Sequence, residues 1–342
     1  MKTYQAAIIG AGRIGRLHAE NITRHIDNVH IKTIVDVAAN ETLRKWAKSL
    51  HIDEISTNYT TVISDPKIDI VFICSSTDTH TSIIEAAAAN KKHIFCEKPI
   101  DLSIARALKC RKTVQQSNIK FQLGFNRRFD HNFIAIRNKI RSGAIGAIRM
   151  LRITSRDPAP PPEEYIKVSG GLFYDMTIHD FDMLRYLTHT EALEVYSRGA
   201  ALVNDITPRY NDCDSAIISI KLASGALAYI ENCRETAYGY DQRVEVLGET
   251  GMLQCTNDYP STVTHFNTDG RIADKPYYFF LERYNQSFID EVKAFISSIN
   301  DDQIPPVTLE DGLMPLYLAE GAKRSFKTGK NIVLADIIQE FN

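Results

Sequence analysis

The first third of the chain alternates short, continuously apolar segments with longer segments in which apolar residues recur at helical spacing. Strands that are apolar throughout and separated by amphipathic helices are typical of a parallel sheet covered on both faces. Residues 1–123 are therefore predicted to form a doubly wound α/β domain of the Rossmann type. The predicted strands are "YQAAIIG", "IKTIVD", "IDIVFICS", "KHIFCEKP" and "KFQLGF", and the predicted helices span residues 13–25, 40–50, 79–90 and 103–116.

Beyond residue 123 several segments alternate apolar with polar residues, which is typical of an antiparallel sheet with one solvated face. They are "LEVYSRGAAL", "DSAIISIKLA", "ALAYIENCRET" and "QRVEVLGETG". Helices are expected near residues 130–141, 285–299 and 309–324, and the apolar segment "NIVLADIIQEF" is expected to close the fold. Residues 124–342 are predicted to form an α+β domain for substrate binding and oligomerisation, with a large, mostly antiparallel sheet and a C-terminal segment that can pack back on the first domain.

Composition excludes several classes of function. The chain has 40 basic and 42 acidic residues, so neither a nucleic-acid nor a membrane-surface partner is predicted. No apolar run has the length of a membrane span, and the chain enters its first strand directly, which favours a cytoplasmic protein. The six scattered cysteines contain no C-x-x-C pair and are interpreted as reduced, mostly buried thiols.

A glycine-rich turn joins the first strand to the first helix. Gly10, Gly12 and Gly15 have the spacing G-x-G-x-x-G, and Asp36 ends the second strand 21 positions after Gly15. This context predicts a dinucleotide whose pyrophosphate meets the start of the helix and whose ribose hydroxyls bind Asp36. The negative charge of Asp36 favours NAD over NADP, although Asp36 could instead only cap the turn. The predicted cofactor residues also include Arg13 and Ile14, which lie between the glycines.

The carboxyl ends of two further strands carry candidate site residues. "FCEKPI" places Glu97 and Lys98 at the sheet edge where doubly wound folds bind ligands, and Pro99 stiffens the turn. Lys98 could donate to a substrate oxygen and favour its alkoxide form, or could be a surface lysine. The loop "CSSTDTHT" is expected to border the nicotinamide ribose, although its histidine could simply begin the next helix. Its candidate residues are Ser75, Thr77 and His80, and Glu97 and Lys98 complete the predicted cofactor set.

The segment "FYDMTIHDFDM" places titratable groups among apolar residues. On one helix, Asp175 and His179 would lie on the same face, about 5–6 Å apart, as a proton-handling pair. Asp182 falls close to that face, whereas Asp180 is expected to point away. An amphipathic helix with an acidic polar face is the alternative interpretation.

Taken together, the glycine turn, "CEKP" and the helix beginning "GGLFYDMTIHDFDMLRYL" resemble the Gfo/Idh/MocA family, the glucose-fructose oxidoreductase and inositol dehydrogenase group. The resemblance runs over essentially the whole chain. "MTIHDFDM", "GFNRRFD" and "AYGYDQRVEVLG" are similar to the inositol 2-dehydrogenase branch. The resemblance implies NAD-dependent oxidation of myo-inositol at its axial hydroxyl to 2-keto-myo-inositol, by a homotetramer formed through the C-terminal sheet.

With the resemblance, Lys98, Asp175 and His179 are the predicted catalytic residues. His179 would take the hydroxyl proton, Asp175 would orient His179, and Lys98 would stabilise the developing charge on oxygen. A polyol needs many hydrogen bonds when it leaves water, so further contacts are expected. The predicted substrate-binding residues are Lys98, Asn126, Arg127, Asp157, Asp175, His179 and Tyr238.

Several alternatives stay open. The substrate could be scyllo- or chiro-inositol, because the segment "SRDPAPPPEEY" varies among inositol dehydrogenases, or an aldose such as glucose. Asn126 and Asp157 could be ordinary loop or surface residues. A non-catalytic, NAD-sensing regulator on the same fold is the alternative from another class. A metal site at Asp175, His179 and Asp182 ranks low, and no metal is predicted, because hydride transfer to NAD needs no Lewis acid when a lysine serves.

Overall fold

The computed structural model describes residues 2–52 and 54–341. It divides the chain into two compact units, the first made of Met1–Asn126 and Gln286–Met314 and the second of Arg127–Asn285 and Pro315–Asn342. Residues 286–314 therefore belong with the first unit, although they follow most of the second in sequence. Within the described residues, no helix has both the length and the apolar composition that crossing a bilayer requires.

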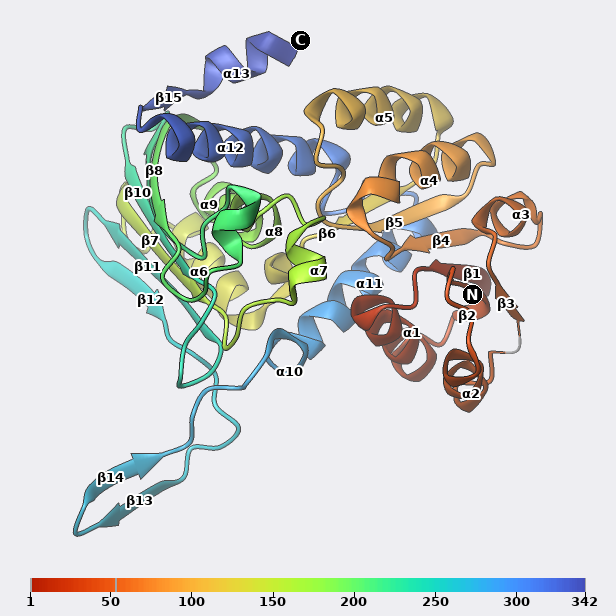
Figure 1. The fold of residues 1–342 in the computed structure, drawn as a ribbon, viewed down its shortest axis with the longest axis horizontal. Helices are drawn as coiled ribbons and strands as arrows, with labels where there is room; N and C mark the ends of the chain where they lie inside the picture. The colour runs from red at the N-terminus through yellow and green to blue at the C-terminus, as the bar shows by residue number, and fades with distance from the viewer. Residues whose placement is uncertain (1, 53, 342) are drawn as a thin grey trace. The chain divides into compact units, whose positions relative to one another are not determined.

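A six-stranded sheet forms the centre of the first unit (Figure 1). β1 lies between β2 and β4, and every neighbouring pair of strands is parallel. The chain builds outwards from β1 in both directions, which confirms the predicted doubly wound α/β domain. In sheet order the strands are β3 (Glu54–Ser56), β2 (Val29–Val35), β1 (Tyr4–Ile9), β4 (Ile70–Ile73), β5 (His93–Glu97) and β6 (Phe121–Gly124).

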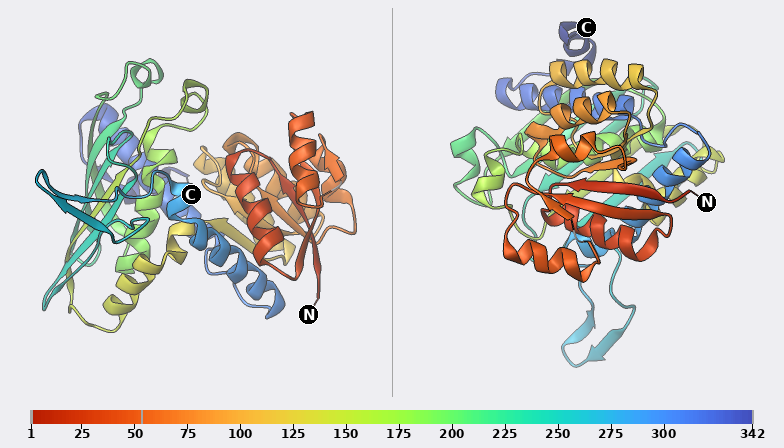
Figure 2. Two further views of the ribbon diagram at one scale, coloured as in Figure 1. Left: turned by 90° about the horizontal axis from the view of Figure 1, so that it is seen from below. Right: turned by 90° about the vertical axis from the view of Figure 1, so that its right-hand side faces the viewer.

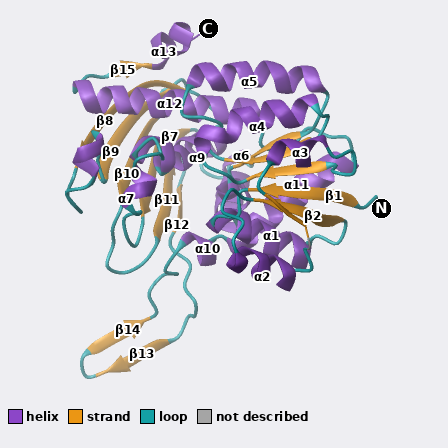
Figure 3. Ribbon diagram, turned by 45° about the vertical axis from the view of Figure 1, so that its right-hand side comes forward, coloured by secondary structure: helices purple, strands orange, loops and turns teal. Residues whose placement is uncertain are grey.

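Helices cover both faces of this sheet (Figure 3). Three of them, α1, α2 and α11, share one apolar core with β1, β2 and β4, while α3, α4 and α5 lie on the other face. β3 and α3 were not predicted, because β3 has only three residues, none of them buried, and so no apolar run marks it. The helices are α1 (Arg13–His25), α2 (Glu41–Ser49), α3 (Tyr59–Ser64), α4 (Thr77–Ala89), α5 (Ile104–Ser117) and α11 (Asn285–Asn300).

The second unit contains a seven-stranded mixed sheet. β7 and β10 are parallel, and the other neighbouring pairs are antiparallel, which confirms the predicted, mostly antiparallel sheet. In sheet order the strands are β12 (Met252–Cys255), β11 (Asp241–Gly248), β7 (Ile148–Arg156), β10 (Leu227–Cys233), β9 (Ser215–Leu222), β8 (Ala192–Ala200) and β15 (Ile332–Val333).

The two faces of this sheet differ. Helices α6 (His131–Arg141), α9 (Thr177–Thr188) and α12 (Leu309–Thr328) lie along one face (Figure 2, left), where alternate strand residues such as Ile153 and Ile230 are buried. The strand neighbours of these residues point the other way. On that outer face Met150, Ile217 and Leu227 are each 52% exposed. The alternation read from the sequence thus corresponds to a covered face and an outer face.

The segment around Asp175 differs from the single helix that was predicted. α8 (Leu172–Asp175) ends at Asp175, Met176 has φ −95° and ψ −58°, and α9 begins at Thr177. The prediction of one continuous helix is therefore wrong. The remaining short helices are η1 (Asn126–Phe129), α7 (Glu163–Ile166), η2 (Thr207–Tyr210), α10 (Phe280–Arg283) and α13 (Leu334–Phe341).

A two-stranded ribbon extends away from the sheet of the second unit (Figure 1). It consists of β13 (Thr264–Asn267) and β14 (Gly270–Ala273), which pair in antiparallel fashion. Phe266 and Ile272 are 73% and 53% exposed, so neither strand buries a face. A ribbon without a buried face lacks the alternation that marks a strand in sequence, and it was not predicted.

Candidate functional site

The glycine turn of the first unit has the shape that a pyrophosphate requires. Gly10 has φ +96°, and a Cβ there would lie 2.5 Å from the backbone nitrogen of Ser75. A Cβ on Gly15 would overlap the carbonyl oxygen of Gly10, whereas one on Gly12 would meet no described atom within 4 Å. Gly12 caps α1 without a side-chain hydrogen bond. The first turn of α1 thus offers N–H groups beside open space, which fits the phosphates of NAD.

Asp36 is tied to this turn by its carboxylate. Oδ2 accepts a hydrogen bond from the N–H of Ala11 at 2.8 Å, and Oδ1 accepts one from the N–H of Ala38 at 2.8 Å. Asp36 therefore caps the turn, as the alternative interpretation expected. Each carboxylate oxygen has a second lone pair, so Asp36 can hold the turn and still accept a hydrogen bond from a ribose hydroxyl. Arg13 and Ile14 begin α1 next to the turn, with Arg13 exposed and Ile14 half-buried.

Replacement of Asp36 with Ser is expected to lower kcat/KM for NAD by about 10- to 100-fold, because hydrogen bonds to a charged group contribute about 1.5–3 kcal/mol. The ratio of kcat/KM for NADP to that for NAD should rise, because the charge that repels a 2′-phosphate is gone. Steady-state kinetics with both cofactors measure this. Asp69→Asn is the matched control, since Asp69 bonds Lys2 and the N–H of Gln5. An unchanged cofactor ratio in the Asp36 variant would contradict the assignment.

His80 connects the loops that follow β4 and β5. It lies in α4 and is 1% exposed, with Nδ1 2.8 Å from the carbonyl oxygen of Pro99 and Nε2 3.0 Å from that of Ser75. Burial lowers the pKa of His80, against the effect of these two carbonyls. Both ring nitrogens therefore face backbone groups, which favours a role in holding the loops over a direct contact with the ribose. Ser75 and Thr77 are half-buried at the start of this helix.

Glu97 is the last residue of β5, Lys98 follows it, and the two side chains have different surroundings. Glu97 is buried, and its Oε1 lies 2.7 Å from Nε2 of His18 on α1, inside the first unit. This contact places the Glu97 carboxylate against His18 in the interior of the first unit. Lys98 follows directly and is half-buried. Asn126, which ends the first unit, is buried with its Nδ2 3.4 Å from Oγ of Ser287.

In the second unit, Asp175 is held by two side chains that the sequence analysis missed. Its Oδ1 accepts a hydrogen bond from the hydroxyl of Tyr165 at 2.7 Å, and its Oδ2 lies 2.9 Å from Nη1 of Arg234. The same nitrogen lies 3.5 Å from Oδ2 of Asp157. Burial raises the pKa of Asp157 to about 6, assisted by the charge of Asp175 and opposed by Arg234. The structure thus brings Asp157 and Asp175 together around one buried cation.

His179 lies in the first turn of α9, after the helix break, and is half-buried. Its backbone N–H donates to the carbonyl of Met176. Because the chain breaks its helix between Asp175 and His179, the regular spacing of one helix face does not set the distance between them. Asp182, which was expected near that face, forms an ion pair with Arg128 through three hydrogen bonds, at 2.6, 2.8 and 3.1 Å.

Asp180, which was expected to point away from the face of Asp175 and His179, lies at the centre of a buried network. Its Oδ1 accepts hydrogen bonds from Arg127 and from Ser155, each at 2.6 Å, and its Oδ2 accepts one from Asn232 at 2.8 Å. Asn232 in turn accepts from Thr177 at 2.6 Å. Buried polar groups that are fully bonded are rigid. Arg127 is therefore a fixed guanidinium and not a mobile surface side chain.

Tyr238 is placed apart from these groups. Its hydroxyl donates to Asp241 and accepts from Arg156, both at 2.7 Å, and Tyr238 is 40% exposed. Arg156 and Asp241 are paired in register and, by strand alternation, lie on the outer face of the sheet. Tyr240, two residues on, is buried instead, and burial raises its pKa to about 12, opposed by the charge of Arg127. Tyr240 was missed, although it lies in the same quoted segment.

Comparison with known proteins identifies the relatives of this chain. Residues 4–125 match the model of an oxidoreductase family with an NAD-binding Rossmann fold, and residues 133–254 match the GFO/IDH/MocA C-terminal domain. An uncharacterized oxidoreductase, YrbE, of Bacillus subtilis is 45% identical over 96% of each chain. Myo-inositol 2-dehydrogenase of Thermotoga maritima is 42% identical over 97% of this chain and 98% of its own.

A solved structure extends this similarity to three dimensions. Scyllo-inositol dehydrogenase from Lactobacillus casei, with bound NAD(H) and scyllo-inositol, superposes with a TM-score of 0.91 at 32% identity, covering 98% of this chain and all of its own. The glycine turn and the doubly wound sheet agree with the NAD-binding Rossmann fold of the first family model. The chain therefore belongs to the Gfo/Idh/MocA family of oxidoreductases, and it is an NAD-dependent oxidoreductase acting on CH–OH groups.

Proposed function

We propose that this protein oxidises myo-inositol at its axial secondary hydroxyl to 2-keto-myo-inositol. The observation that carries the proposal is the Asp175 carboxylate, which Tyr165 and Arg234 hold four residues before His179, in a chain whose first domain binds NAD. The name of the Thermotoga maritima relative supports the choice of myo-inositol. The Lactobacillus casei protein, with its bound scyllo-inositol, makes that isomer the alternative.

In this proposal, each of the three catalytic residues has a separate role. Bound NAD supplies the acceptor for the hydride that leaves the carbinol carbon. His179 takes the hydroxyl proton as general base, and Asp175 orients the imidazole and stabilises its protonated form. Lys98 donates a hydrogen bond to the hydroxyl oxygen, and its charge favours the alkoxide character that develops as the proton leaves. The products are a ketone, NADH and one proton.

Recognition of a polyol requires fixed hydrogen-bonding groups, because each hydroxyl that leaves water without a partner costs affinity. Arg127 meets this requirement, since Asp180 and Ser155 hold its guanidinium in place. Asp157 meets it as an acceptor held near Arg234. We include Asn126 and Tyr238 as further candidates, and Tyr240 joins them because it is buried beside Arg127.

A panel of myo-, scyllo- and chiro-inositol and glucose, each with NAD, tests the proposal by the rate of NADH formation. The largest kcat/KM is expected with myo-inositol. A larger kcat/KM with scyllo-inositol would make that isomer the substrate, and a larger kcat/KM with glucose would make the substrate an aldose. NAD binding without reduction by any of the four would favour a non-catalytic, NAD-sensing regulator.

We also propose that the outer face of the second sheet forms the contact of a homotetramer. Met150 and Leu227 are paired in register and half exposed there, Ile217 is half exposed on the next strand, and exposed apolar surface is a feature of protein–protein contacts. Light scattering of the purified protein measures its mass. A monomeric mass would overturn this proposal and leave the proposed reaction unaffected.

A further inference from the structure

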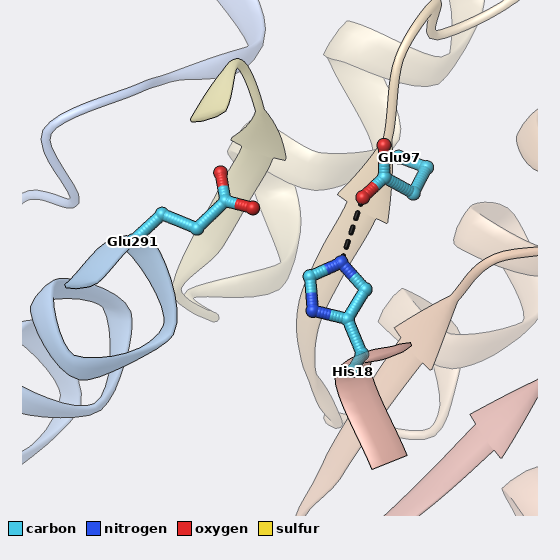
Figure 4. Close-up of side chains that lie close together, drawn as sticks. All are labelled: His18, Glu97 and Glu291. Atoms are coloured by element: carbon cyan, nitrogen blue, oxygen red, sulfur yellow. Dashed lines mark hydrogen bonds and ion pairs between the residues drawn. The ribbon is translucent and has the colours of Figure 1, made fainter. Parts of the chain in front are cut away.

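Three titratable side chains meet inside the first unit, and none of them has so far been assigned to substrate binding or proton transfer. His18 comes from α1, Glu97 from the end of β5 and Glu291 from α11 (Figure 4). One ligand atom of each lies within 4.8 Å of the others. Only one hydrogen bond joins them in Figure 4, between His18 Nε2 and Glu97 Oε1 at 2.7 Å. The carboxylate of Glu291 points toward this pair.

Glu291 is the unusual member of this cluster. It is 0% exposed, and neither of its carboxylate oxygens has a hydrogen-bond partner among the described residues. Its backbone carbonyl accepts a bond from Nε2 of Gln122, which fixes this point of α11 beside β6. An ionised carboxylate buried without a partner is among the most costly arrangements in a protein. The side chain must therefore lose its charge or acquire a counter-charge.

Among the described residues, no lysine or arginine forms an ion pair with Glu291. Aromatic rings enclose His18: Phe95 at 5.1 Å and Phe288 at 5.8 Å, both edge-on. The titratable groups that face Glu291 are His18 from α1, Cys74 from β4 and Glu97 from β5, while β6 contributes the uncharged amide of Gln122. Burial raises the pKa of Glu291 well above its ordinary value, and the charge of Glu97 raises it further. The choice is thus between a proton and a bound metal ion.

Geometry distinguishes these two. Two ligands of one transition-metal ion, each about 2.0–2.2 Å from it, lie roughly 2.8–3.6 Å apart at octahedral or tetrahedral angles. His18 Nε2 and Glu97 Oε1 are 2.7 Å apart, which is the length of a charge-assisted N–H···O bond. This spacing fits a shared proton and is shorter than the spacing of two ligands on one ion. This leaves a proton on Glu291 as the way to remove its charge.

We propose that Glu291 is an uncharged carboxylic acid in the folded protein and a positioning residue for Lys98. An ionised Glu291 would repel the carboxylate of Glu97, which ends β5 and is held there by its hydrogen bond to His18. Displacement of Glu97 would move the end of β5 and with it Lys98, the next residue. The neutral acid removes this repulsion and keeps the bond between His18 and Glu97. The link to Lys98 rests on the proposed function, whereas the protonation of Glu291 does not.

The protonation state is read without substrate. In protein labelled with 13C at the glutamate carboxyl carbon, the Glu291 resonance is assigned by its absence from Glu291→Gln. It is expected at the position of a protonated acid throughout pH 5–8. The position of an ionised carboxylate at pH 7 would overturn the proposal. So would one equivalent of metal, found by elemental analysis of the intact protein and lost in Glu291→Gln.

The stability of the same pair of proteins provides a second test. The acid is neutral when folded but ionises above its ordinary pKa when unfolded, so it stabilises fully at low pH and loses this contribution as pH rises. The ratio of the unfolding constant of the intact protein to that of Glu291→Gln should therefore increase, by up to tenfold per pH unit, between pH 5 and the folded pKa. A ratio that stays flat from pH 5 to 8 would contradict a buried acid.

Positioning is tested with a conservative and a disruptive variant. Glu291→Gln, which keeps the shape of the neutral acid, should retain kcat within about twofold and leave the resonance of a 13C label at Cε of Lys98 unchanged. Glu291→Asp, which shortens the side chain, should shift that resonance and lower kcat. An unshifted Lys98 resonance in both variants would overturn the positioning role. If the intact protein oxidises no polyol, the proposed function fails, while the carboxyl and lysine resonances still decide this inference.

Discussion

Replacement of Lys98 with Met is expected to lower kcat for inositol oxidation by about 10²- to 10³-fold, the effect of removing one preorganised donor from a developing oxyanion. Met keeps much of the length and apolar volume of the lysine stem but has no charge and no N–H. The hydroxyl oxygen would then develop its charge without a counter-charge, while the Rossmann residues that bind NAD are unchanged. Single-turnover formation of NADH measures the chemical step, and fluorescence titration measures NAD affinity.

The matched control is Lys120→Met. Lys120 precedes β6 and pairs at 2.7 Å with Asp302, whose side chain is 94% exposed, so its removal should change kcat less than twofold. Lys98→Arg keeps the charge with a different shape, so its kcat should lie between those of Lys98→Met and Lys120→Met. If Lys98→Met retained kcat within a few-fold while binding NAD normally, the lysine would be a surface residue and the proposed mechanism would lose its oxyanion donor.

The first domain was predictable because local and global signals agree there. β4 is buried along its whole length and the helices beside it are amphipathic, so the pattern of the chain alone indicates the doubly wound sheet. The start of α8 shows the opposite case. The N–H of Leu172 is bound by both carboxylate oxygens of Asp212 at 3.1 Å, a contact from a distant segment. No local pattern indicates such a cap, because Asp212 lies 40 residues from Leu172 in the sequence.

The sequence predicts those parts of the candidate site whose residues lie close together along the chain. Glycine spacing and the position of Asp36 identify the cofactor turn, and the residue types of Asp175 and His179 indicate proton transfer. Arg234 could not be found in this way, because it meets Asp157 and Asp175 only after β10 has become the neighbour of β7. The hint in the sequence is a charged residue directly after an alternating strand, and that pattern is far more common than buried cations are.

Replacement of Arg234 with Met is expected to lower the free energy of unfolding by about 3–5 kcal/mol at pH 8, because it leaves two carboxylates without the cation between them. Arg234 is only 5% exposed, so water cannot take its place at low cost. The catalytic rate should fall as well, since Asp175 would keep only Tyr165 of the two partners that hold it in the second unit. Urea unfolding at pH 5 and pH 8 measures the stability change.

The pH dependence distinguishes lost charge compensation from lost packing. The pKa of Asp157 in the folded protein, about 6, is above its ordinary value of 3.8, so Asp157 contributes stability below pH 4 that is lost as pH rises through 6. Arg234 lowers that pKa, so without it the loss extends to higher pH, and the variant should be destabilised less at pH 5 than at pH 8. Arg209→Met, which removes a 56% exposed side chain paired with Asp205, should cost less than about 1 kcal/mol at either pH. A loss in Arg234→Met that is equal at the two pH values would mean that Arg234 acts through packing alone and does not balance the charges of the two aspartates.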